Sequence, residues 1–400
     1  MYGIAILGYG VVGSGVAEVL NENAARVSQN AAKELGLKYI LDVRDFPDSP
    51  YADLMIKDFS IIENDPEVRV VAETIGGVGV AQEFTRRALL AGKSVVTSNK
   101  ELVAKFGCEL LKIAEENGVN YLFEASVGGG IPILRPITQC LAANKITEIY
   151  GILNGTTNYI LTQMIKEGLP FDTALKQAQT AGYAEADPTS DIDGIDACRK
   201  ISILADLTFG RDINPDWIKT VGIRTVAAQD VNFAAAGGFK IKLLGRAIQN
   251  ESGLISAYVA PHLVPADNLL ASVENVMNGI VVRGNAIGDV MFYGAGAGKL
   301  PTASAVVADI IDAAKHEKLR KLFSWDDGDI SIMRDSAELE SRWYARLAGS
   351  KDAVLSKFPE ALLLGEDTET AGFILPMASK AIIDNSLAEH KVLTLFRVLD

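Results

Sequence analysis

Cysteine and histidine, the side chains most often used to bind transition metals, are scarce in this sequence. The three cysteines are widely spaced and form no C-x-x-C pair, which excludes a disulfide framework and a cysteine-based zinc site. The three histidines are far apart in the chain, which argues against a histidine-rich metal cluster and a Ser-His-Asp triad. We therefore expect any proton transfer to come from lysine and carboxylate side chains.

Long apolar runs and clusters of basic residues are also lacking. No apolar stretch reaches the length that a membrane span needs, and the N-terminus lacks the basic segment and cleavage pattern of a secretory signal. The net charge of −13, with no Lys/Arg cluster to offset it, argues against binding to a nucleic-acid backbone. We therefore expect a cytoplasmic globular protein whose 400 residues form two or three domains.

What the sequence does contain, near its start, is a glycine-rich loop between an apolar strand and a helix. In "AILGYGVVGSGVAEVL", residues 5–20, Gly8, Gly10 and Gly13 have the spacing G-x-G-x-x-G. The first glycine permits a tight turn, the second lets the backbone approach a pyrophosphate, and the third lets the helix pack closely on the strand. Unpaired N–H groups at the helix N-terminus favour phosphate. The loop therefore predicts a dinucleotide site.

The first third of the chain alternates between strands and helices. Strands are predicted at residues 3–8, 37–43, 67–76 and 120–124, with a further strand ending at Thr97. This alternation is typical of an α/β fold with a Rossmann-type, doubly wound parallel sheet. We expect this dinucleotide-binding domain to span residues 1–135 and to be completed by a helix at 300–317.

The pattern changes after residue 135. Residues 136–299 combine several helices with antiparallel-type strands around an "NESG" turn, which predicts an α+β domain for substrate binding and dimerisation. A charged connector, residues 316–329, leads to residues 331–400. There, four strand-like segments and the helix "KDAVLSKF" predict a small C-terminal α/β module.

The end of the second strand carries the residues expected to meet the adenosine ribose. Asp42 favours NAD, whereas Arg44 can receive the 2′-phosphate of NADP. Both an acidic residue and an arginine are present, so the sequence does not decide between NAD and NADP. Because of Arg44, NADP(H) is favoured. The alternative is that Arg44 is a solvated charge at the strand end. Further candidate cofactor-binding residues lie in the glycine loop and at later strand ends: Val11, Val12, Thr74, Ser98 and Lys100.

Acidic residues are concentrated in "GYAEADPTSDIDGIDACRK", residues 182–200. Asp196 and Lys200 are four residues apart in a predicted helix, so they share one face and can pair. A lysine held by a carboxylate can position a proton for a carbonyl oxygen as hydride reaches its carbon. Glu185 could accept a hydrogen bond from a substrate ammonium group. The alternatives are an exposed salt bridge and a divalent-cation site, although the spacing does not fit an EF-hand loop.

Three other stretches are rich in small and polar residues where open α/β sheets place ligands. Lys100 in "TSNKE" follows a buried-type strand and could reach the crevice, although a surface lysine is the alternative. In "EASVGGGIP", residues 124–132, the glycines expose backbone groups to a ligand or cation, or form a simple helix-entry turn. In "NGTTNYI", residues 154–160, Asn154 and the two threonines could cap a helix.

These motifs together resemble homoserine dehydrogenase over residues 1 to about 320. The resemblance implies interconversion of aspartate 4-semialdehyde and L-homoserine with NAD(P)H, on the route to threonine and methionine. It implies that Lys200 is the catalytic lysine, Asp196 its carboxylate partner, Glu185 a substrate-binding residue, and Lys100 a lysine near nicotinamide and substrate. It further implies a sodium or potassium ion on the loop of Glu124, Val127, Gly129 and Ile131, and a cofactor covered by Gly296 and Gly298.

Further expectations follow from the resemblance. No kinase-like domain precedes the glycine loop, so the monofunctional form is expected, as a homodimer or homotetramer. Residues 331–400 stand where many members carry an ACT domain, but they lack the usual proline–glycine turn, which predicts a degenerate ACT-like module. Two alternatives remain: another amino-acid semialdehyde dehydrogenase and a non-catalytic NADP(H) sensor. Aspartate semialdehyde dehydrogenase is disfavoured because it needs a nucleophilic cysteine.

Overall fold

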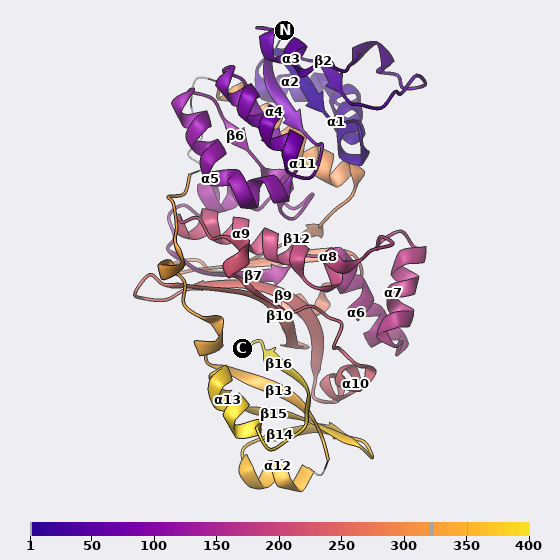
Figure 1. Cartoon of the computed structure of the whole chain (residues 1–400), viewed down its shortest axis with the longest axis vertical. Coiled ribbons are helices and arrows are strands. Elements are labelled where there is room, and N and C mark those ends of the chain that lie inside the picture. The colour runs from indigo at the N-terminus through magenta and orange to yellow at the C-terminus, as the bar shows by residue number, and fades with distance from the viewer. Residues whose placement is uncertain (1, 318, 320–323, 350) are drawn as a thin grey trace. The chain divides into compact units, whose positions relative to one another are not determined.

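The computed structural model describes residues 2–317, 319, 324–349 and 351–400, and the chain divides into two compact units (Figure 1). The first unit consists of Met1–Lys145, Ser202–Pro215 and Gly294–Gly328. The second consists of Ile146–Ile201, Asp216–Tyr293 and Asp329–Asp400. The charged connector predicted at 316–329 lies partly outside the described residues.

The first unit is built on a six-stranded sheet with the order β3-β2-β1-β4-β5-β6, in which every pairing is parallel. Its strands are β1 (Tyr2–Leu7), β2 (Leu35–Leu41), β3 (Met55–Ile56), β4 (Val68–Glu73), β5 (Ser94–Thr97) and β6 (Tyr121–Leu122). The strand order reverses direction between β1 and β4, and ligands of such sheets bind at the carboxyl ends of the strands there. The predicted Rossmann-type sheet is confirmed.

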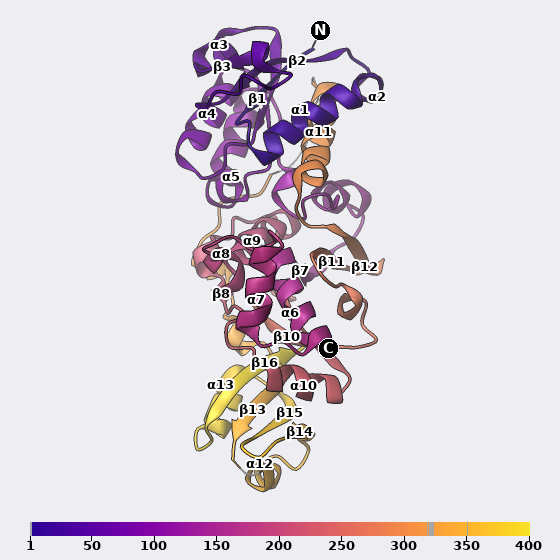
Figure 2. The same cartoon turned by 90° about the vertical axis from the view of Figure 1, so that its right-hand side faces the viewer.

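Helices pack on this sheet from segments far apart in the sequence. They are α1 (Val11–Glu22), α2 (Ala24–Ala31), α3 (Phe59–Asn64), α4 (Gly79–Leu90), α5 (Lys100–Glu116) and α11 (Lys299–Lys315), with a π-helical turn at Pro136–Cys140. Figure 2 shows α11 beside α1. Gly15 permits this close approach, because a Cβ there would lie 2.9 Å from the carbonyl oxygen of Lys299. The elements α2, β3 and α3 were not predicted from the sequence.

The second unit is built on a ten-stranded mixed sheet. Nine strands run in the order β12-β11-β7-β9-β10-β16-β13-β15-β14, and β8 also pairs with β10. Their bounds are β7 (Ile146–Ile152), β8 (Lys219–Thr220), β9 (Phe239–Gln249), β10 (Ile255–Pro265), β11 (Met277–Gly284), β12 (Gly288–Ala295), β13 (Ser341–Ala348), β14 (Leu362–Glu366), β15 (Thr370–Ala378) and β16 (Val392–Val398). The predicted antiparallel pair around "NESG" is β9–β10.

The second unit also contains the helices α6 (Gly155–Glu167), α7 (Phe171–Thr180), α8 (Thr189–Ile192), α10 (Ala228–Ala236), α12 (Lys351–Lys357) and α13 (Lys380–Leu387). The helix α9 (Ile195–Phe209) begins in the second unit, and its residues from Ser202 onward belong to the first. In the part of the chain that the structure describes, no helix combines the length and the apolar character that a membrane span requires.

The strand β16 joins the C-terminal segment to the central part of the second unit. It pairs antiparallel with β13 and parallel with β10, through His262↔Arg397 and Leu263↔Val398. Figure 1 shows β16 between β10 and β13. The four strands and the helix predicted in residues 331–400 are present, together with α13, which was not predicted. One continuous sheet therefore links two segments that the sequence analysis treated as separate.

Candidate active site

The glycine loop lies at the carboxyl end of β1 and leaves its backbone open at one point. Gly8 has φ +89°, and a Cβ at Gly13 would lie 1.9 Å from the carbonyl oxygen of Gly8, so neither position tolerates a side chain. Thr74 Oγ1 lies 2.9 Å from the carbonyl oxygens of Leu7 and of Gly8. The nearest atom to a Cβ at Gly10 is 4.0 Å away. This open position at the N-terminus of α1 fits a pyrophosphate.

Asp42 and Arg44 follow β2 and form an ion pair beside the glycine loop. Arg44 donates from Nε to Asp42 Oδ1 (3.1 Å) and from Nη2 to Oδ2 (3.0 Å), and the Tyr9 N–H donates to Oδ2 (2.7 Å). Burial acts to raise the pKa of Asp42, but these hydrogen bonds outweigh it and lower the pKa to about 2. The ionised carboxylate therefore holds Arg44, whose side chain is 61% exposed, beside Gly10.

A buried carboxylate fixes the turn after β5. Glu73, the last residue of β4, is fully buried and accepts a hydrogen bond from Thr97 Oγ1 at 2.6 Å. Burial raises the pKa of Glu73. Asn99 caps α5, so Ser98 lies in the turn and Lys100 is the first residue of the helix. Glu73 was not predicted from the sequence; its signal is a carboxylate at the end of the apolar run Val70–Ala72.

Gly296 and Gly298 lie between β12 and α11. Gly298 directly precedes α11 with φ +129°. A Cβ at Gly129 would lie 2.5 Å from the carbonyl oxygen of Gly296, and the Gly130 N–H donates to the carbonyl of Ala295 at 3.0 Å. The loop with the predicted cation-binding residues therefore packs backbone to backbone against the loop of Gly296 and Gly298.

Residues 124–131 present buried carbonyl groups. Val127 and Ile131 are buried, and Gly129 lies between them. Within the described ranges, the carbonyl oxygens of these three residues accept no hydrogen bond from protein groups. No cluster of three or more His, Cys, Asp or Glu side chains suited to a metal ion occurs among the described residues. Because carbonyl oxygens are ligands of hard cations, these backbone groups fit a cation.

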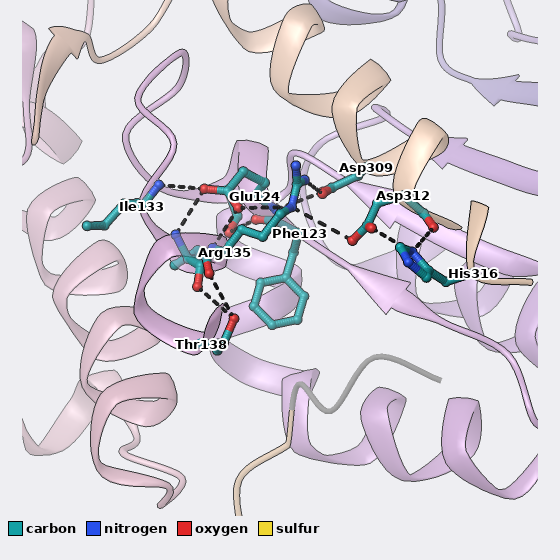
Figure 3. A network of polar contacts seen from close by, with 10 residues as sticks. Phe123, Glu124, Ile133, Arg135, Thr138, Asp309, Asp312 and His316 are labelled. Carbon is teal, nitrogen blue, oxygen red and sulfur yellow. Dashed lines mark hydrogen bonds and ion pairs between the residues drawn. The ribbon is translucent and has the colours of Figure 1, made fainter. Parts of the chain in front are cut away.

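The carboxylate of Glu124 caps the turn that follows this loop (Figure 3). Oε1 accepts from the N–H groups of Ile133 (2.6 Å) and Leu134 (2.9 Å), and Oε2 accepts from that of Arg135 (2.8 Å). The guanidinium of Arg135 pairs with Asp309 of α11, and Asp309 in turn accepts the Glu124 N–H at 2.8 Å. This network holds the carbonyl-lined loop against α11.

In the second unit, the predicted lysine–carboxylate pair lies on α9 and is buried. Asp196 is 4% exposed and Lys200 is 7% exposed. Lys200 Nζ donates to Asp196 Oδ2 at 2.7 Å and to the carbonyl of Leu153 at 2.8 Å. The predicted pairing is confirmed, and the alternative of an exposed salt bridge is wrong. The two contacts fix the position of the ammonium group.

Asn154 connects this pair to a second carboxylate. Its Oδ1 accepts the Thr157 N–H at 2.8 Å, which confirms the predicted cap of α6. Its Nδ2 donates to Asp196 Oδ2 at 2.8 Å and to Asp191 Oδ1 at 2.7 Å. Burial raises the pKa of Asp191. Glu185 lies apart from this network, in an exposed loop where Gln179 Nε2 donates to its backbone carbonyl at 3.1 Å.

The first unit has a Rossmann-type sheet with an open glycine loop, and the second has a buried lysine–carboxylate pair. These are the parts of a nicotinamide-dependent oxidoreductase. Comparison with known proteins gives the family. Residues 8–124 match the model of the homoserine dehydrogenase NAD-binding domain, and residues 132–311 match that of homoserine dehydrogenase. The chain belongs to the homoserine dehydrogenase family, whose members interconvert aspartate 4-semialdehyde and L-homoserine.

Individual relatives of this chain are also homoserine dehydrogenases. The homoserine dehydrogenase of Neisseria gonorrhoeae is 38% identical over 98% of this chain and 91% of its own length. That of Bacillus subtilis is 42% identical over 79% of this chain and 73% of its own length. The crystal structure of the Thiobacillus denitrificans enzyme is similar with a TM-score of 0.90 and 33% identity, over 100% of this chain and 98% of that one. These findings support the dehydrogenase over the predicted alternatives.

Proposed function

We propose that Lys200 is the group that exchanges the proton of the reaction with the oxygen on C4 of the substrate. Hydride chemistry at C4 is supplied by the nicotinamide when it is bound. Oxidation of homoserine also releases the hydroxyl proton, which Lys200 in its neutral amine form takes up directly or through a water, becoming an ammonium group. In the reduction of the semialdehyde, the ammonium form of Lys200 gives this proton back. The observation that carries this role is the burial of Lys200 and its fixation by Asp196 and the Leu153 carbonyl.

The remaining roles follow the chemistry of the side chains. We propose that Glu185 binds the substrate ammonium group, that Asp196 holds Lys200 and contacts substrate, and that Lys100 serves both cofactor and substrate. The glycine loop, Thr74 and Ser98 would hold the dinucleotide, with Gly296 and Gly298 as its cover. The position of Gly298 supports its role in covering the dinucleotide. Lys299, the next residue, packs on Gly15 of α1, the helix that follows the glycine loop.

Steady-state oxidation of L-homoserine, followed at the nicotinamide absorbance, tests this function. We expect turnover with L-homoserine and none with L-2-aminobutyrate, which lacks the 4-hydroxyl group. Absence of turnover with both NAD⁺ and NADP⁺, in a protein that still binds them, would contradict the proposed roles.

We propose that the enzyme prefers NADP(H). Arg44 supports this preference because its exposed guanidinium is held beside Gly10, where it can pair with a 2′-phosphate. The solved structure of a hyperthermophilic archaeal homoserine dehydrogenase is in complex with NADPH; that protein is 29% identical, with a TM-score of 0.66 over 78% of this chain and 97% of its own length. Arg44→Ala should lower kcat/KM for NADP⁺ by about tenfold or more and leave that for NAD⁺ nearly unchanged. Arg26→Ala, an exposed arginine of α2, is the matched control.

We further propose a sodium or potassium ion on the backbone oxygens of Glu124, Val127, Gly129 and Ile131. The support is the buried carbonyl groups of Val127, Gly129 and Ile131, which accept no hydrogen bond from the protein groups that the structure describes. Residues 331–400 are proposed to be an ACT-like module, supported by their order β13-α12-β14-β15-α13-β16. A homodimer or homotetramer is proposed from the family, and light scattering of the purified protein tests it.

A further inference from the structure

A cavity of about 360 Å³ opens in the second unit where its sheet forks. Both β8 and β16 pair with the same edge of β10, β8 at Tyr258 and Val259 and β16 at His262 and Leu263. Beyond these pairings β8 continues into a loop, while β16 follows β13. The cavity lies in this fork, with Ala260 and Pro261 of β10 in its wall and α13 at its rim.

The lining combines apolar walls with positive charge. Val221, Pro261 and Leu395 contribute apolar surface, and Lys219, Lys380 and Arg397 contribute three cations against the single carboxylate of Asp384. Such a composition, a mostly apolar pocket with a few convergent polar groups, is typical of sites for small molecules. It favours a ligand with an apolar body and one negative charge.

The Arg397 guanidinium is fixed in position before any ligand arrives. It lies 4.3 Å from the centre of the Trp343 ring and 4.9 Å from that of Tyr258, and Nη2 donates to the carbonyl of Ser336 at 2.6 Å. An immobilised donor loses little freedom on binding, so the affinity for an anion is higher than a mobile side chain would give.

The two lysines can exchange their present partners for a ligand. Lys219 pairs with Asp335 and Lys380 pairs with Asp384, and each of these side chains is between 44% and 62% exposed. Ion pairs at such exposure contribute little to stability because water screens them. A carboxylate entering the cavity would therefore meet lysine charges that the protein can release at small cost.

The wall formed by β8 leads directly to the buried carboxylates of the candidate active site. Val221 is followed by Gly222, where a Cβ would lie 2.0 Å from the carbonyl oxygen of Ile192. The Ile223 N–H donates to the same carbonyl at 2.8 Å. Ile192 adjoins Asp191, which Asn154 links to Asp196. This backbone contact is too close to absorb a movement of β8 without shifting α8.

We propose that the cavity in the sheet fork binds a small carboxylate with an apolar chain, and that its occupancy changes the activity of the Asp196–Lys200 pair through β8 and α8. The binding part stands on the cavity alone. The effect on activity rests on the proposed function of Lys200.

Calorimetric titration with two carboxylates of the same skeleton, isocaproate and L-leucine, tests binding. Isocaproamide, which lacks the charge, is the ligand control. We expect at least one carboxylate to bind and the amide to bind at least about tenfold more weakly. Binding of both carboxylates assigns the site to simple carboxylic acids, and binding of L-leucine alone assigns it to amino acids. No saturable binding of either, or equal binding of the amide, overturns the proposal.

A variant with a larger side chain at the cavity tests whether the carboxylate binds there. Ala381 lies on the exposed rim on α13, so Ala381→Phe adds volume there without removing a contact. Its matched control is Ile382→Phe, at a neighbouring position that is 56% exposed and outside the lining. We expect Ala381→Phe to weaken carboxylate binding by about tenfold or more, with Ile382→Phe unchanged. Equal affinities in the two variants would show that the ligand binds elsewhere.

Homoserine oxidation with and without the bound carboxylate tests the coupling. We expect the ligand to change kcat or KM about threefold or more in the parent enzyme and in Ile382→Phe, and to have no effect on Ala381→Phe. Binding without any kinetic effect overturns the coupling. If the protein does not oxidise homoserine at all, the proposed function fails, while the titrations still decide whether the cavity is a site.

Discussion

Among single residues, burial distinguishes the Lys200–Asp196 pair from the many ion pairs on the surface. Exposed pairs contribute about 0–1 kcal/mol because water and salt screen them. Asp196 and Lys200 are almost fully buried; Asn154 donates a hydrogen bond to Asp196, and the Leu153 carbonyl accepts one from Lys200. Retaining two charges in such a place costs desolvation energy, which is expected where the charges serve chemistry.

Replacement of Lys200 tests that interpretation. Lys200→Ala removes the proposed proton carrier, so kcat should fall by about 10²–10⁴-fold, while the Kd of NADP(H) stays nearly unchanged because the glycine loop is untouched. Steady-state kinetics and a fluorescence titration with NADPH provide the two measurements. Lys176→Ala, an exposed lysine on α7, is the control. Retained turnover together with weaker cofactor binding would contradict the assignment.

Spacing explains which site residues could be predicted from the sequence. Asp196 and Lys200 lie on one helix, and the four-residue interval alone places their side chains together. Glu73 and Asp191 act through partners that are distant in the sequence or lie in another element, such as Thr97 and Asn154. No local sequence pattern predicts such contacts, so Glu73 and Asp191 could not be assigned to the site before the fold was known.

For whole elements, hydrophobic periodicity predicted most helices and strands but not how the strands pair. The parallel sheet follows from alternation of strand and helix, which has a strong sequence signature. By contrast, β8 has only two residues, which is too short for a hydrophobic pattern. Its pairing with β10 depends on backbone groups that are distant in the sequence. The helix α13 was also missed. Pairing of β16 with β10 is likewise long-range, and no turn between them fixes the register.

A neutral histidine is buried at this last pairing. His262 is fully buried on β10; its Nδ1 is 2.9 Å from the carbonyl oxygen of Ala260, and its Nε2 is 3.2 Å from the Tyr258 hydroxyl. One donor and one acceptor satisfy a neutral imidazole. Burial, assisted by the nearby charge of Arg246, lowers the pKa of His262 to about 3. The folded protein therefore keeps this ring uncharged at pH values where the unfolded chain protonates it.

Stability should therefore decrease on acidification through this residue. The pKa of His262 is depressed from 6.5 to about 3 on folding, so its contribution is complete above pH 6.5 and is lost as the pH falls toward 3. Within this window each pH unit costs up to about 1.4 kcal/mol. Urea unfolding at pH 7 and pH 5 should show a smaller loss in His262→Gln than in the parent. His390→Gln, at a partly exposed position, is the control, and an unchanged loss in His262→Gln would contradict the prediction.

Taken as a whole, the second unit has one sheet where the sequence suggested two modules. Asp230 of α10 is fully buried and binds side chains from β13 and β16, accepting from Tyr344 (2.9 Å), Arg346 (2.7 Å) and Thr394 (3.2 Å). The C-terminal segment is thus tied to the central part by a buried ion pair as well as by strand pairing. We expect the two segments to unfold together.

Removal of Asp230 tests this cooperativity. Asp230→Ala leaves Arg346 buried without its partner, so the free energy of unfolding should fall by about 3–5 kcal/mol. Hydrogen exchange should accelerate in β9 and β10 as well as in β13 to β16. Asp172→Ala, an exposed position on α7, is the control. Faster exchange confined to residues 331–400 would mean that this segment unfolds by itself.

The return of α11 to the first unit affects how the protein can be made. Its buried face, which includes Val306 and Ile310, covers a sheet whose strands all come from the first third of the chain. A ribosome that has finished residues 1–145 must still add residues 146–298 before it reaches the first residue of this helix, and the helix itself ends at Lys315. During that interval the apolar surface that α11 later covers stays exposed, and contacts of such long sequence separation form slowly. The nucleotide-binding unit is therefore begun first and completed late, so we expect chaperones to bind its exposed apolar surface on the nascent chain.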